Sequence, residues 1–264
     1  IKKIKKMKKL IVITSGKGGV GKTTTAINLG AAINYFGEDA LVIDANLGTP
    51  NIGIHLNSPE VPVSLNHVLQ EKADVFEAVY EHNSGLKIIP ASISIKELKK
   101  INFKKLKNYK QDFQNIAKWV IVDSAAGLGE EAKEALKMAD ELIIVTNPEM
   151  PAITDALKTI KIAEEMNKPI RGVIITKVRK NNSEMQAETV KEMLESPILG
   201  MVPDDISIQE SLNLKDAVVH THPKSNSARA YKEIASNLLD VEYDSNKDKE
   251  KMIHKVLKKL GLMT

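Results

Sequence analysis

Short apolar runs alternate with longer segments of helical periodicity along most of the chain. The apolar runs have the length and the polar boundaries that are typical of strands buried in a parallel sheet. They cover residues 10–14, 40–44, 86–90, 119–123, 141–146 and 169–176. Apolar side chains recur at helical spacing in residues 24–36, 130–138, 153–166 and 225–239, which predicts helices. This alternation predicts an α/β fold: a doubly wound, mostly parallel sheet with helices on both faces.

Turn residues and charged stretches predict the remaining connections. Gly37 follows the first predicted helix as its cap, and N-P-E-M-P at residues 147–151 predicts a turn. Residues 64–84 predict short helices. The lysine-rich residues 96–118 predict one longer helix with a solvated charged face, and a nucleic-acid-binding patch is the alternative for these lysines.

A glycine-rich stretch, S-G-K-G-G-V-G-K-T-T-T at residues 15–25, joins the first predicted strand to the first predicted helix. Its spacing fits the phosphate-loop pattern G-x-x-x-x-G-K-[ST]. Glycines let several backbone N–H groups point into one concavity, and the positive end of the following helix favours an anion there. Lys22 can neutralise the β- and γ-phosphates of a nucleotide, and the Thr23 hydroxyl can ligate Mg²⁺. The predicted nucleotide-binding residues of the loop are Gly16, Lys17, Gly18, Gly19, Val20, Gly21, Lys22, Thr23 and Thr24.

Two aspartates end apolar runs that follow the glycine-rich loop. Asp44 ends the run at residues 40–44, and Asp123 ends W-V-I-V-D at residues 119–123. A carboxylate at the carboxyl end of a strand beside a phosphate loop can hold the water molecules of Mg²⁺. We therefore predict a Mg²⁺ site made by Thr23, Asp44 and Asp123. A structural capping role is the alternative for Asp44.

The glycine-rich loop also carries a second lysine, Lys17, directly after its first glycine. With this lysine, the string K-G-G-V-G-K-T-T resembles the deviant Walker A loop of the MinD/ParA family of ATPases. In that family the extra lysine reaches the phosphates of the partner in a nucleotide-sandwich dimer. The resemblance therefore implies a homodimer that forms on ATP binding. A solvated loop lysine is the alternative for Lys17.

Two later stretches resemble the switch regions of MinD proteins. L-V-I-D-A-N-L-G-T-P-N-I-G-I-H-L at residues 41–56 resembles the first, and D-S-A-A-G-L-G at residues 123–129 resembles the second, in which Gly127 gives the loop freedom to sense the γ-phosphate. The family usually has an aspartate, which positions the attacking water, where this chain has Asn46. An amide oxygen can accept a hydrogen bond from water but cannot take its proton, so we predict slow hydrolysis. The predicted catalytic residues are Lys17, Lys22, Asp44, Asn46 and Asp123.

Two weaker similarities concern the base of the nucleotide. Residues 176–178, T-K-V, align with family residues that border adenine, and M-V-P-D-D at residues 201–205 aligns with the family segment I-P-E-D. Lys177, Pro203 and Asp205 are therefore predicted to contact the nucleotide. An ordinary turn is the alternative at these positions.

The chain contains no cysteine, which excludes disulfides, thiolate metal sites and a cysteine nucleophile. It also excludes the function of those relatives that hold iron–sulfur clusters or nickel through cysteines. His55, His67 and His82 lack the spacing of metal ligands, so we expect them to be polar surface residues.

The formal net charge of +4 conceals an uneven distribution. Residues 1–9 carry six lysines, and residues 247–264 carry six lysines and two acidic side chains. The remaining residues, 10–246, have 26 basic and 32 acidic side chains. An acidic body argues against an extended nucleic-acid surface, and basic ends favour contact with something anionic.

The last residues, K-M-I-H-K-V-L-K-K-L-G-L-M at 251–263, predict an amphipathic helix with lysines on one side. Its apolar face comprises Met252, Ile253, Val256, Leu257 and Leu260. Such a helix is too short to cross a bilayer but suits the interface of an anionic membrane. It resembles the membrane-targeting helix of MinD proteins. Docking on the protein's own body is the alternative.

Four parts are therefore predicted: a basic extension at residues 1–9, an ATPase domain at 10–240, a polar linker at 241–250 and a membrane-targeting helix at 251–264. No apolar run approaches the roughly 20 residues that span a bilayer, and no secretory segment follows the basic start. We expect a cytoplasmic protein that is peripheral on the inner face of the cell membrane.

Taken together, the resemblance implies a MinD-like ATPase with ATP or ADP and Mg²⁺ as cofactors, which positions cell-division or other machinery. The predicted partners are a second copy of the chain, an anionic membrane surface and a regulatory or recruited protein, whereas nucleic acid is disfavoured. Two alternatives stay open. One is a ParA-like partitioning ATPase that binds non-specific DNA, and the other is a slowly hydrolysing nucleotide sensor or scaffold.

Overall fold

The computed structural model describes residues 8–98, 101–179 and 184–244. The membrane-targeting helix predicted at residues 251–264 lies outside the described residues, as do most of the basic extension at 1–9 and of the linker at 241–250. These predictions therefore stay predictions.

A single sheet runs through the described part of the chain and contains eight strands in the order β3-β4-β2-β5-β1-β6-β7-β8. Neighbouring strands are parallel except for β3 and β4, which pair in antiparallel fashion. The predicted fold class is confirmed. The strands are β1 (Lys9–Thr14), β2 (Ala40–Ala45), β3 (Tyr80–Glu81), β4 (Lys87–Ile89), β5 (Trp119–Ser124), β6 (Glu141–Thr146), β7 (Ile170–Val178) and β8 (Ile198–Pro203).

The long helices agree with the predicted ones to within a few residues. They are α1 (Lys22–Tyr35), α6 (Glu130–Met138), α7 (Met150–Glu165) and α11 (Asn226–Leu239). The shorter α-helices are α2 (Ile52–His55), α3 (Leu65–Leu69), α4 (Ile95–Leu98), α5 (Lys110–Ile116), α8 (Ala187–Leu194), α9 (Ile206–Asn213) and α10 (Val218–Thr221). Two 3₁₀ helices, η1 (Val75–Ala78) and η2 (Phe103–Tyr109), complete the set. Among the described helices, none is long and apolar enough to cross a membrane.

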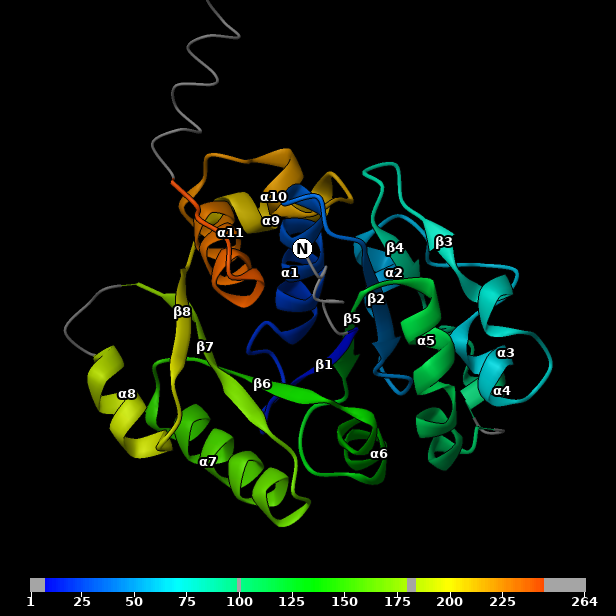
Figure 1. Cartoon of the computed structure of the whole chain (residues 1–264), viewed down its shortest axis with the longest axis horizontal. Coiled ribbons are helices and arrows are strands. Elements are labelled where there is room, and N and C mark those ends of the chain that lie inside the picture. Colours follow the sequence, from blue (N-terminus) through cyan, green and yellow to red (C-terminus); the bar gives the residue numbers. More distant parts are fainter. Residues whose placement is uncertain (1–7, 99–100, 180–183, 245–264) are drawn as a thin grey trace, which may run out of the picture.

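Alternate residues of the central strands supply two hydrophobic layers, because successive side chains of a strand point to opposite faces of the sheet. Ile11 and Ile13 pack with α1, α10 and α11, whereas Leu10 and Val12 pack with α3, α5 and α6. Figure 1 shows α1, α10 and α11 together on one side of the sheet and α6 and α7 on the other. Since both faces are covered, the strands are apolar at almost every position.

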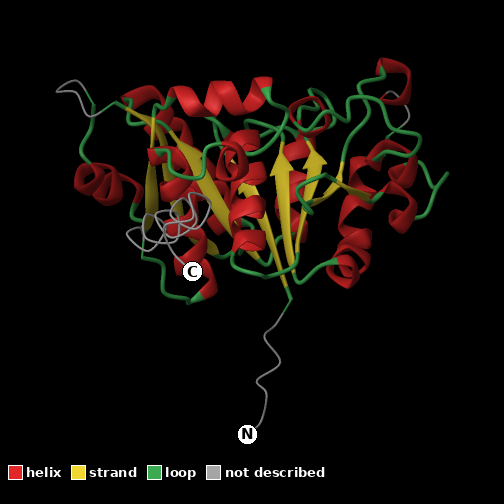
Figure 2. Cartoon of the chain, turned by 90° about the horizontal axis from the view of Figure 1, so that it is seen from above, coloured by secondary structure: helices red, strands yellow, loops and turns green. Residues whose placement is uncertain are grey.

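The strand order places the change of winding direction near the middle of the sheet. β1 lies between β5 and β6, and β2 lies on the far side of β5, so the chain leaves β1 in one direction and later returns to its other side. The arrowheads of the central strands, which mark their carboxyl ends, point in the same direction (Figure 2). In doubly wound sheets, ligands bind at the carboxyl ends of the strands where the winding direction changes. The loops after β1, β2 and β5 meet there.

Two predicted elements differ from the structure. The single helix predicted at residues 96–118 is broken into α4, η2 and α5, because the Asn102 side chain accepts a hydrogen bond from the Lys104 N–H and starts a new helix. The short helices predicted at residues 64–84 are present as α3 and η1, but the last part of this range is β3, which pairs with β4. Helical spacing of apolar residues does not reveal such interruptions.

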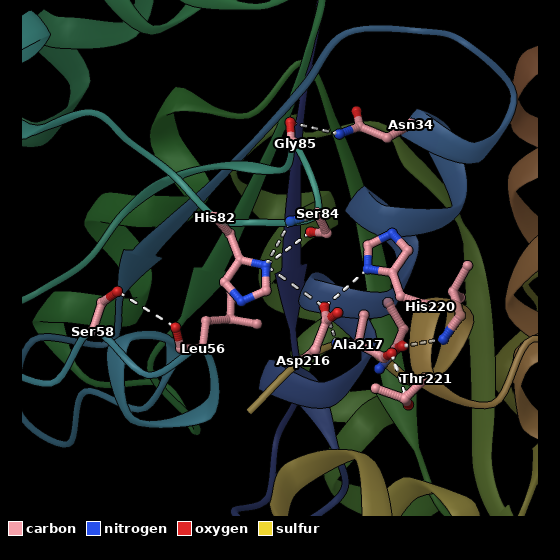
Figure 3. A network of polar contacts seen from close by, with 12 residues as sticks. Asn34, Leu56, Ser58, His82, Ser84, Gly85, Asp216, Ala217, His220 and Thr221 are labelled. Atoms are coloured by element: carbon pink, nitrogen blue, oxygen red, sulfur yellow. Dashed lines mark hydrogen bonds and ion pairs between the residues drawn. The ribbon is translucent and has the colours of Figure 1, made fainter. Parts of the chain in front are cut away.

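The prediction that His82 is an ordinary surface residue is wrong, because its side chain is only 10% exposed. Its Nδ1 lies 2.8 Å from Ser84 Oγ and 3.7 Å from Asp216 Oδ1, and His220 Nδ1 lies 2.9 Å from the same Asp216 oxygen. Burial raises the pKa of Asp216, but the His220 and Ala217 hydrogen bonds outweigh it and hold that pKa below its ordinary value. This network (Figure 3) fastens the loop between β3 and β4 to the start of α10.

Candidate nucleotide-binding site

The glycine-rich loop forms the turn between β1 and α1, as its sequence predicts. Gly21 is the N-cap of α1 with φ of +92°, a left-handed conformation that favours glycine. At Gly16, a Cβ atom would lie 2.1 Å from the carbonyl oxygen of Asp155 in α7, so only glycine fits. The close approach of α7 and the left-handed turn therefore explain these two glycines.

Side chains from other elements hold the loop by binding its carbonyl groups. Thr176 Oγ1 donates to the carbonyl of Val20 at 2.5 Å, and Lys177 Nζ donates to the carbonyl of Gly19 at 2.7 Å. Both donors lie near the end of β7. Ser15 Oγ donates to the carbonyl of Lys17 at 2.7 Å. These bonds use carbonyl oxygens of the loop, which leaves its N–H groups available for a ligand.

Lys22 is the first residue of α1, and only 7% of it is exposed. Burial lowers the pKa of its ammonium group, and the nearby Asp123 partly opposes this effect. The positive end of the helix and the buried lysine together create a strong preference for an anion in front of the loop. Lys17, by contrast, is exposed on the surface of the same loop.

Thr23 and Asp123 meet as the sequence predicts. Thr23 Oγ1 donates a hydrogen bond of 2.5 Å to Asp123 Oδ2, whereas Asp123 Oδ1 is buried without a hydrogen-bond partner. Asp44 lies directly opposite Asp123 in the pairing of β2 with β5, and both residues are fully buried. An unpartnered buried carboxylate oxygen is costly, so this position favours a cation.

Asp44 also performs the capping role that the sequence left open. Its Oδ2 accepts hydrogen bonds of 2.9 Å from the N–H groups of both Asn51 and Ile52, and its Oδ1 accepts one of 3.2 Å from the N–H of Asn46. The carboxylate therefore shapes the loop between β2 and α2. Contact of Asp44 with Mg²⁺ through water remains a prediction.

Burial raises the pKa of both carboxyl groups. The pKa of Asp44 rises to about 8 because of burial and then because of the neighbouring Asp123. That of Asp123 rises to about 6 because burial outweighs the hydrogen bond from Thr23 and the charge of Lys22. Mg²⁺ would relieve this penalty, since it prefers carboxylate and hydroxyl oxygens.

The donor set fits Mg²⁺ that is shared with a nucleotide. Thr23 and Asp123 offer oxygen atoms beside the phosphate loop. Within the described residues, no three histidine, cysteine or acidic side chains form a group that could hold a metal ion. Mg²⁺ commonly completes its shell with water and substrate phosphates, so a sparse protein contribution is what such a site requires.

Asn46 is half-buried in the loop after β2. Its Nδ2 donates to the carbonyl of Thr49 at 2.7 Å, and its Oδ1 accepts from the Thr49 hydroxyl at 3.1 Å. A carbonyl oxygen has two lone pairs, so Oδ1 keeps one acceptor position for another donor such as water.

A cavity of about 450 Å³ extends from the phosphate loop along α1 toward α9, a size suited to a small-molecule ligand. The predicted residues that line it are Gly18, Gly19, Gly21, Lys22, Thr23, Thr24, Asn46, Lys177, Pro203 and Asp205. Gly16, Lys17, Val20, Asp44 and Asp123 are not among its lining residues. The structure therefore brings most of the predicted site into one cavity, with the acidic pair behind it.

Asp205 has a structural role at the far end of the cavity. Its carboxylate accepts hydrogen bonds from the N–H of Ser207 and from the N–H and hydroxyl of Ser227, at 2.9–3.0 Å. These bonds cap α9 and join it to α11. Partial burial raises the pKa of Asp205, but the bonds outweigh it and hold the pKa below its ordinary value. A base contact by Asp205 remains a prediction.

Several lining residues were not predicted. His55, Gln209 and Tyr231 line the cavity, and they come from α2, α9 and α11. Burial lowers the pKa of His55, and the charge of Lys215 lowers it further, so the imidazole is neutral at neutral pH. The prediction that His55 is an ordinary surface residue is wrong. Gln209 lies in α9, a helix that was not predicted from the sequence.

The phosphate loop between the first strand and helix, the Thr23–Asp123 pair and the cavity define a P-loop nucleotide-binding protein of the doubly wound α/β class. Residues 11–218 match the CobQ/CobB/MinD/ParA nucleotide binding domain, so the chain belongs to this family. The resemblance found in the sequence is confirmed.

Two curated proteins illustrate the similarity in sequence. An uncharacterized ATP-binding protein of Methanocaldococcus jannaschii is 36% identical over 252 residues, which cover 95% of this chain and 96% of that protein. The septum site-determining protein MinD of Synechocystis is 30% identical over 239 residues, which cover 88% of this chain and 90% of that protein.

Two solved structures illustrate the similarity in fold. The septum site-determining protein MinD of Pyrococcus horikoshii, complexed with Mg-ADP, has a TM-score of 0.84 and 28% identity and covers 88% of this chain and 96% of its own. MinD in the MinC:MinD cell division protein complex of Aquifex aeolicus has a TM-score of 0.80 and 28% identity, with 89% and 97% covered. The bound Mg-ADP supports the predicted cofactors, ATP or ADP with Mg²⁺.

The raised pKa values predict a pH-dependent stability. A folded state that holds protons on Asp44 and Asp123, which the unfolded state releases near pH 4, loses stability as the pH rises toward about 8. In the absence of Mg²⁺ and nucleotide, we expect Tm to fall by several degrees between pH 5.5 and pH 8. Asp123→Asn should reduce this fall, because it removes one titrating group and one charge beside Asp44.

Thermal unfolding at both pH values measures this effect. The control is Glu188→Gln, which changes an exposed side chain of α8 and should leave the fall in Tm as it is in the wild type. An Asp123→Asn variant with the full wild-type fall would contradict the prediction. Added Mg-ADP should raise the Tm of the wild type more than that of Asp123→Asn.

Proposed function

We propose that this protein is a Mg²⁺-dependent ATPase switch, and that two copies of it close around bound ATP. The observation that carries the proposal is the arrangement of one cavity. Phosphate-loop residues, Thr23 and Asn46 line this cavity, while Lys17 is exposed on the same loop. The family and the similar MinD proteins support the ATPase class.

In this proposal the N–H groups of the loop and Lys22 bind the phosphates of ATP. The Thr23 hydroxyl would ligate Mg²⁺, and Asp123 and Asp44 would hold it through water. When bound, Mg²⁺ neutralises charge on the β- and γ-phosphates. Lys177, Pro203 and Asp205 line the end of the cavity where the base would lie.

Asn46 sets the rate in this proposal. Its Oδ1 can accept a hydrogen bond from the attacking water, but it cannot remove a proton. Hydrolysis is therefore slow, and the ATP-bound state is long-lived. Asn46 also favours a second candidate function, a nucleotide sensor or scaffold that scarcely hydrolyses ATP. Measured turnover separates the two.

Lys17 links the site to a second copy of the chain. Gly18 and Gly19 line the cavity of their own chain, whereas Lys17 does not. An exposed lysine beside the phosphates can neutralise charge on the nucleotide of a partner, and two such contacts form symmetrically in a homodimer. Dimerisation then depends on ATP.

The membrane-targeting helix predicted at residues 251–264, here called the tail, would make membrane binding depend on dimerisation. In this predicted helix, each basic residue near an anionic surface would contribute roughly 1 kcal/mol, and the few apolar side chains would add modestly. Two tails held in one dimer gain from effective concentration, by about 10²- to 10⁴-fold. The protein would thus be cytoplasmic with ADP and peripheral on the inner face of the cell membrane with ATP.

A further partner is part of the proposal. The A. aeolicus MinD structure is a complex with MinC, and the similar curated protein is septum site-determining. By analogy, the ATP-bound dimer recruits a protein and positions cell-division or other machinery. Binding of the dimer to non-specific DNA is disfavoured, because residues 10–246 have more acidic than basic side chains.

Asn46→Asp should speed hydrolysis. An aspartate at this position can take the proton of the attacking water, so we expect kcat to rise about tenfold or more. Single-turnover hydrolysis of ATP measures the effect, with Asn108→Asp as a control on an exposed residue of η2. An unchanged kcat would refute the role of Asn46 in limiting the rate.

Lys17→Ala should prevent dimerisation without preventing nucleotide binding. We expect a monomer with ATP and Mg²⁺ in light scattering, a fall in kcat of about tenfold or more and an ADP affinity within about twofold of the wild type. The matched control is Lys72→Ala, an exposed lysine far from the loop in sequence. Dimerisation that survives in Lys17→Ala would contradict the proposed role of this lysine.

Deletion of residues 252–264 should abolish membrane binding. Vesicles that contain phosphatidylglycerol should co-sediment the full chain with ATP and Mg²⁺, less of it with ADP, and none of the truncated chain. Vesicles of phosphatidylcholine alone are the control. Equal sedimentation in all cases would contradict the proposed membrane switch. ATP-dependent binding to DNA instead of vesicles would favour a partitioning ATPase.

A further inference from the structure

Glu131, in the first turn of α6, reaches across to the loop that contains Asn46. Its Oε1 accepts hydrogen bonds from the backbone N–H groups of Leu47 and Gly48, the latter at 3.1 Å. These two residues directly follow Asn46. The side chain of Glu131 is therefore bound to the backbone beside the residue that we propose to position the attacking water.

Two carboxylates bind the backbone of the loop between β2 and α2. At its base, Asp44 binds the N–H groups of residues 46, 51 and 52. At its outer part, Glu131 binds residues 47 and 48. Leu47 is 2% exposed and packs with residues of α6, which adds an apolar anchor. Without Glu131, only the hydrogen bonds to Asp44 and the contacts within the loop would hold Asn46 in place.

The same helix is connected to the phosphate loop. α6 begins directly after the loop that follows β5, and in that loop the N–H of Gly127 donates to the carbonyl of Ser15 at 2.9 Å. A continuous path therefore leads from Ser15 through Gly127 and the start of α6 to Glu131, and from there to the backbone beside Asn46.

The environment of Glu131 supports this role. Burial raises the pKa of its carboxyl, and the bonds from Gly48 and Leu47 oppose the rise. The preceding residue, Glu130, differs: its side chain is 63% exposed and lies 4.0 Å from Lys104. The two neighbouring glutamates thus provide a matched pair for experiment.

We propose that Glu131 is a positioning residue that holds the loop at residues 46–49 against α6, sets the position of Asn46 at the nucleotide, and couples this loop to the one that follows β5. The part that concerns Asn46 rests on the proposed ATPase function. The tether, which is the pair of hydrogen bonds from Leu47 and Gly48 to Glu131, does not depend on that function. The two parts are tested by different measurements.

The experiment compares Glu131→Ala, Glu131→Gln and Glu130→Ala in the full chain. In Glu131→Ala, we expect faster hydrogen exchange at the amides of Leu47 and Gly48, because they lose their acceptor. We expect kcat for ATP to fall about tenfold, because Asn46 is less well placed, while the Kd for Mg-ADP stays within about twofold. Glu131→Gln should keep most of both properties, since its amide oxygen still accepts hydrogen bonds. Glu130→Ala should match the wild type.

Each outcome decides one part. Unchanged exchange at Leu47 and Gly48 in Glu131→Ala would overturn the tether. Faster exchange with an unchanged kcat, or a Kd for Mg-ADP that weakens as much as kcat falls, would overturn the positioning role. If the wild type does not hydrolyse ATP, the proposed function fails and the role at Asn46 fails with it, whereas exchange in the nucleotide-free protein still decides the tether.

Discussion

Two buried carboxylates, Asp44 and Asp123, face one another at the ends of neighbouring parallel strands, and the rest of the site is arranged around them. Burial makes both charged forms costly and raises both pKa values, and the charge of Asp123 raises the pKa of Asp44 further. The protein offsets part of this cost with the N–H groups of the loop after β2, the Thr23 hydroxyl and Lys22. One oxygen of Asp123 stays without a partner. A cation bound with a polyphosphate would satisfy this remaining demand.

The topology makes this arrangement possible. Because β5 lies between β1 and β2, the carboxyl ends of these three strands bring the phosphate loop and both aspartates together. β7 adds two donors, Thr176 and Lys177, which bind carbonyls of the loop. The site is thus preorganised by several elements.

The parts that the sequence did not reveal share a physical property. Glu131 and the network of His82, Asp216 and His220 act through contacts between segments that are far apart in the chain. Polar side chains of this kind have no periodicity or spacing that distinguishes them from solvated residues. The strand β8 was missed for a different reason: its residues, I-L-G-M-V-P, are apolar, but the glycine and the proline among them are more typical of turns.

Local sequence alone determined the fold class, the phosphate loop and the two aspartates, because backbone geometry, strand burial and anion binding each demand particular residues at fixed spacing. It also marked Asn46 as a departure from the family. Tertiary structure alone showed that Lys177 and Asp205 form hydrogen bonds with other segments of the body, and that Glu131 binds the loop of Asn46. The physical reason is that a side chain's hydrogen-bond partner depends on which elements the sheet brings together, and this information is not contained in any one segment of the chain.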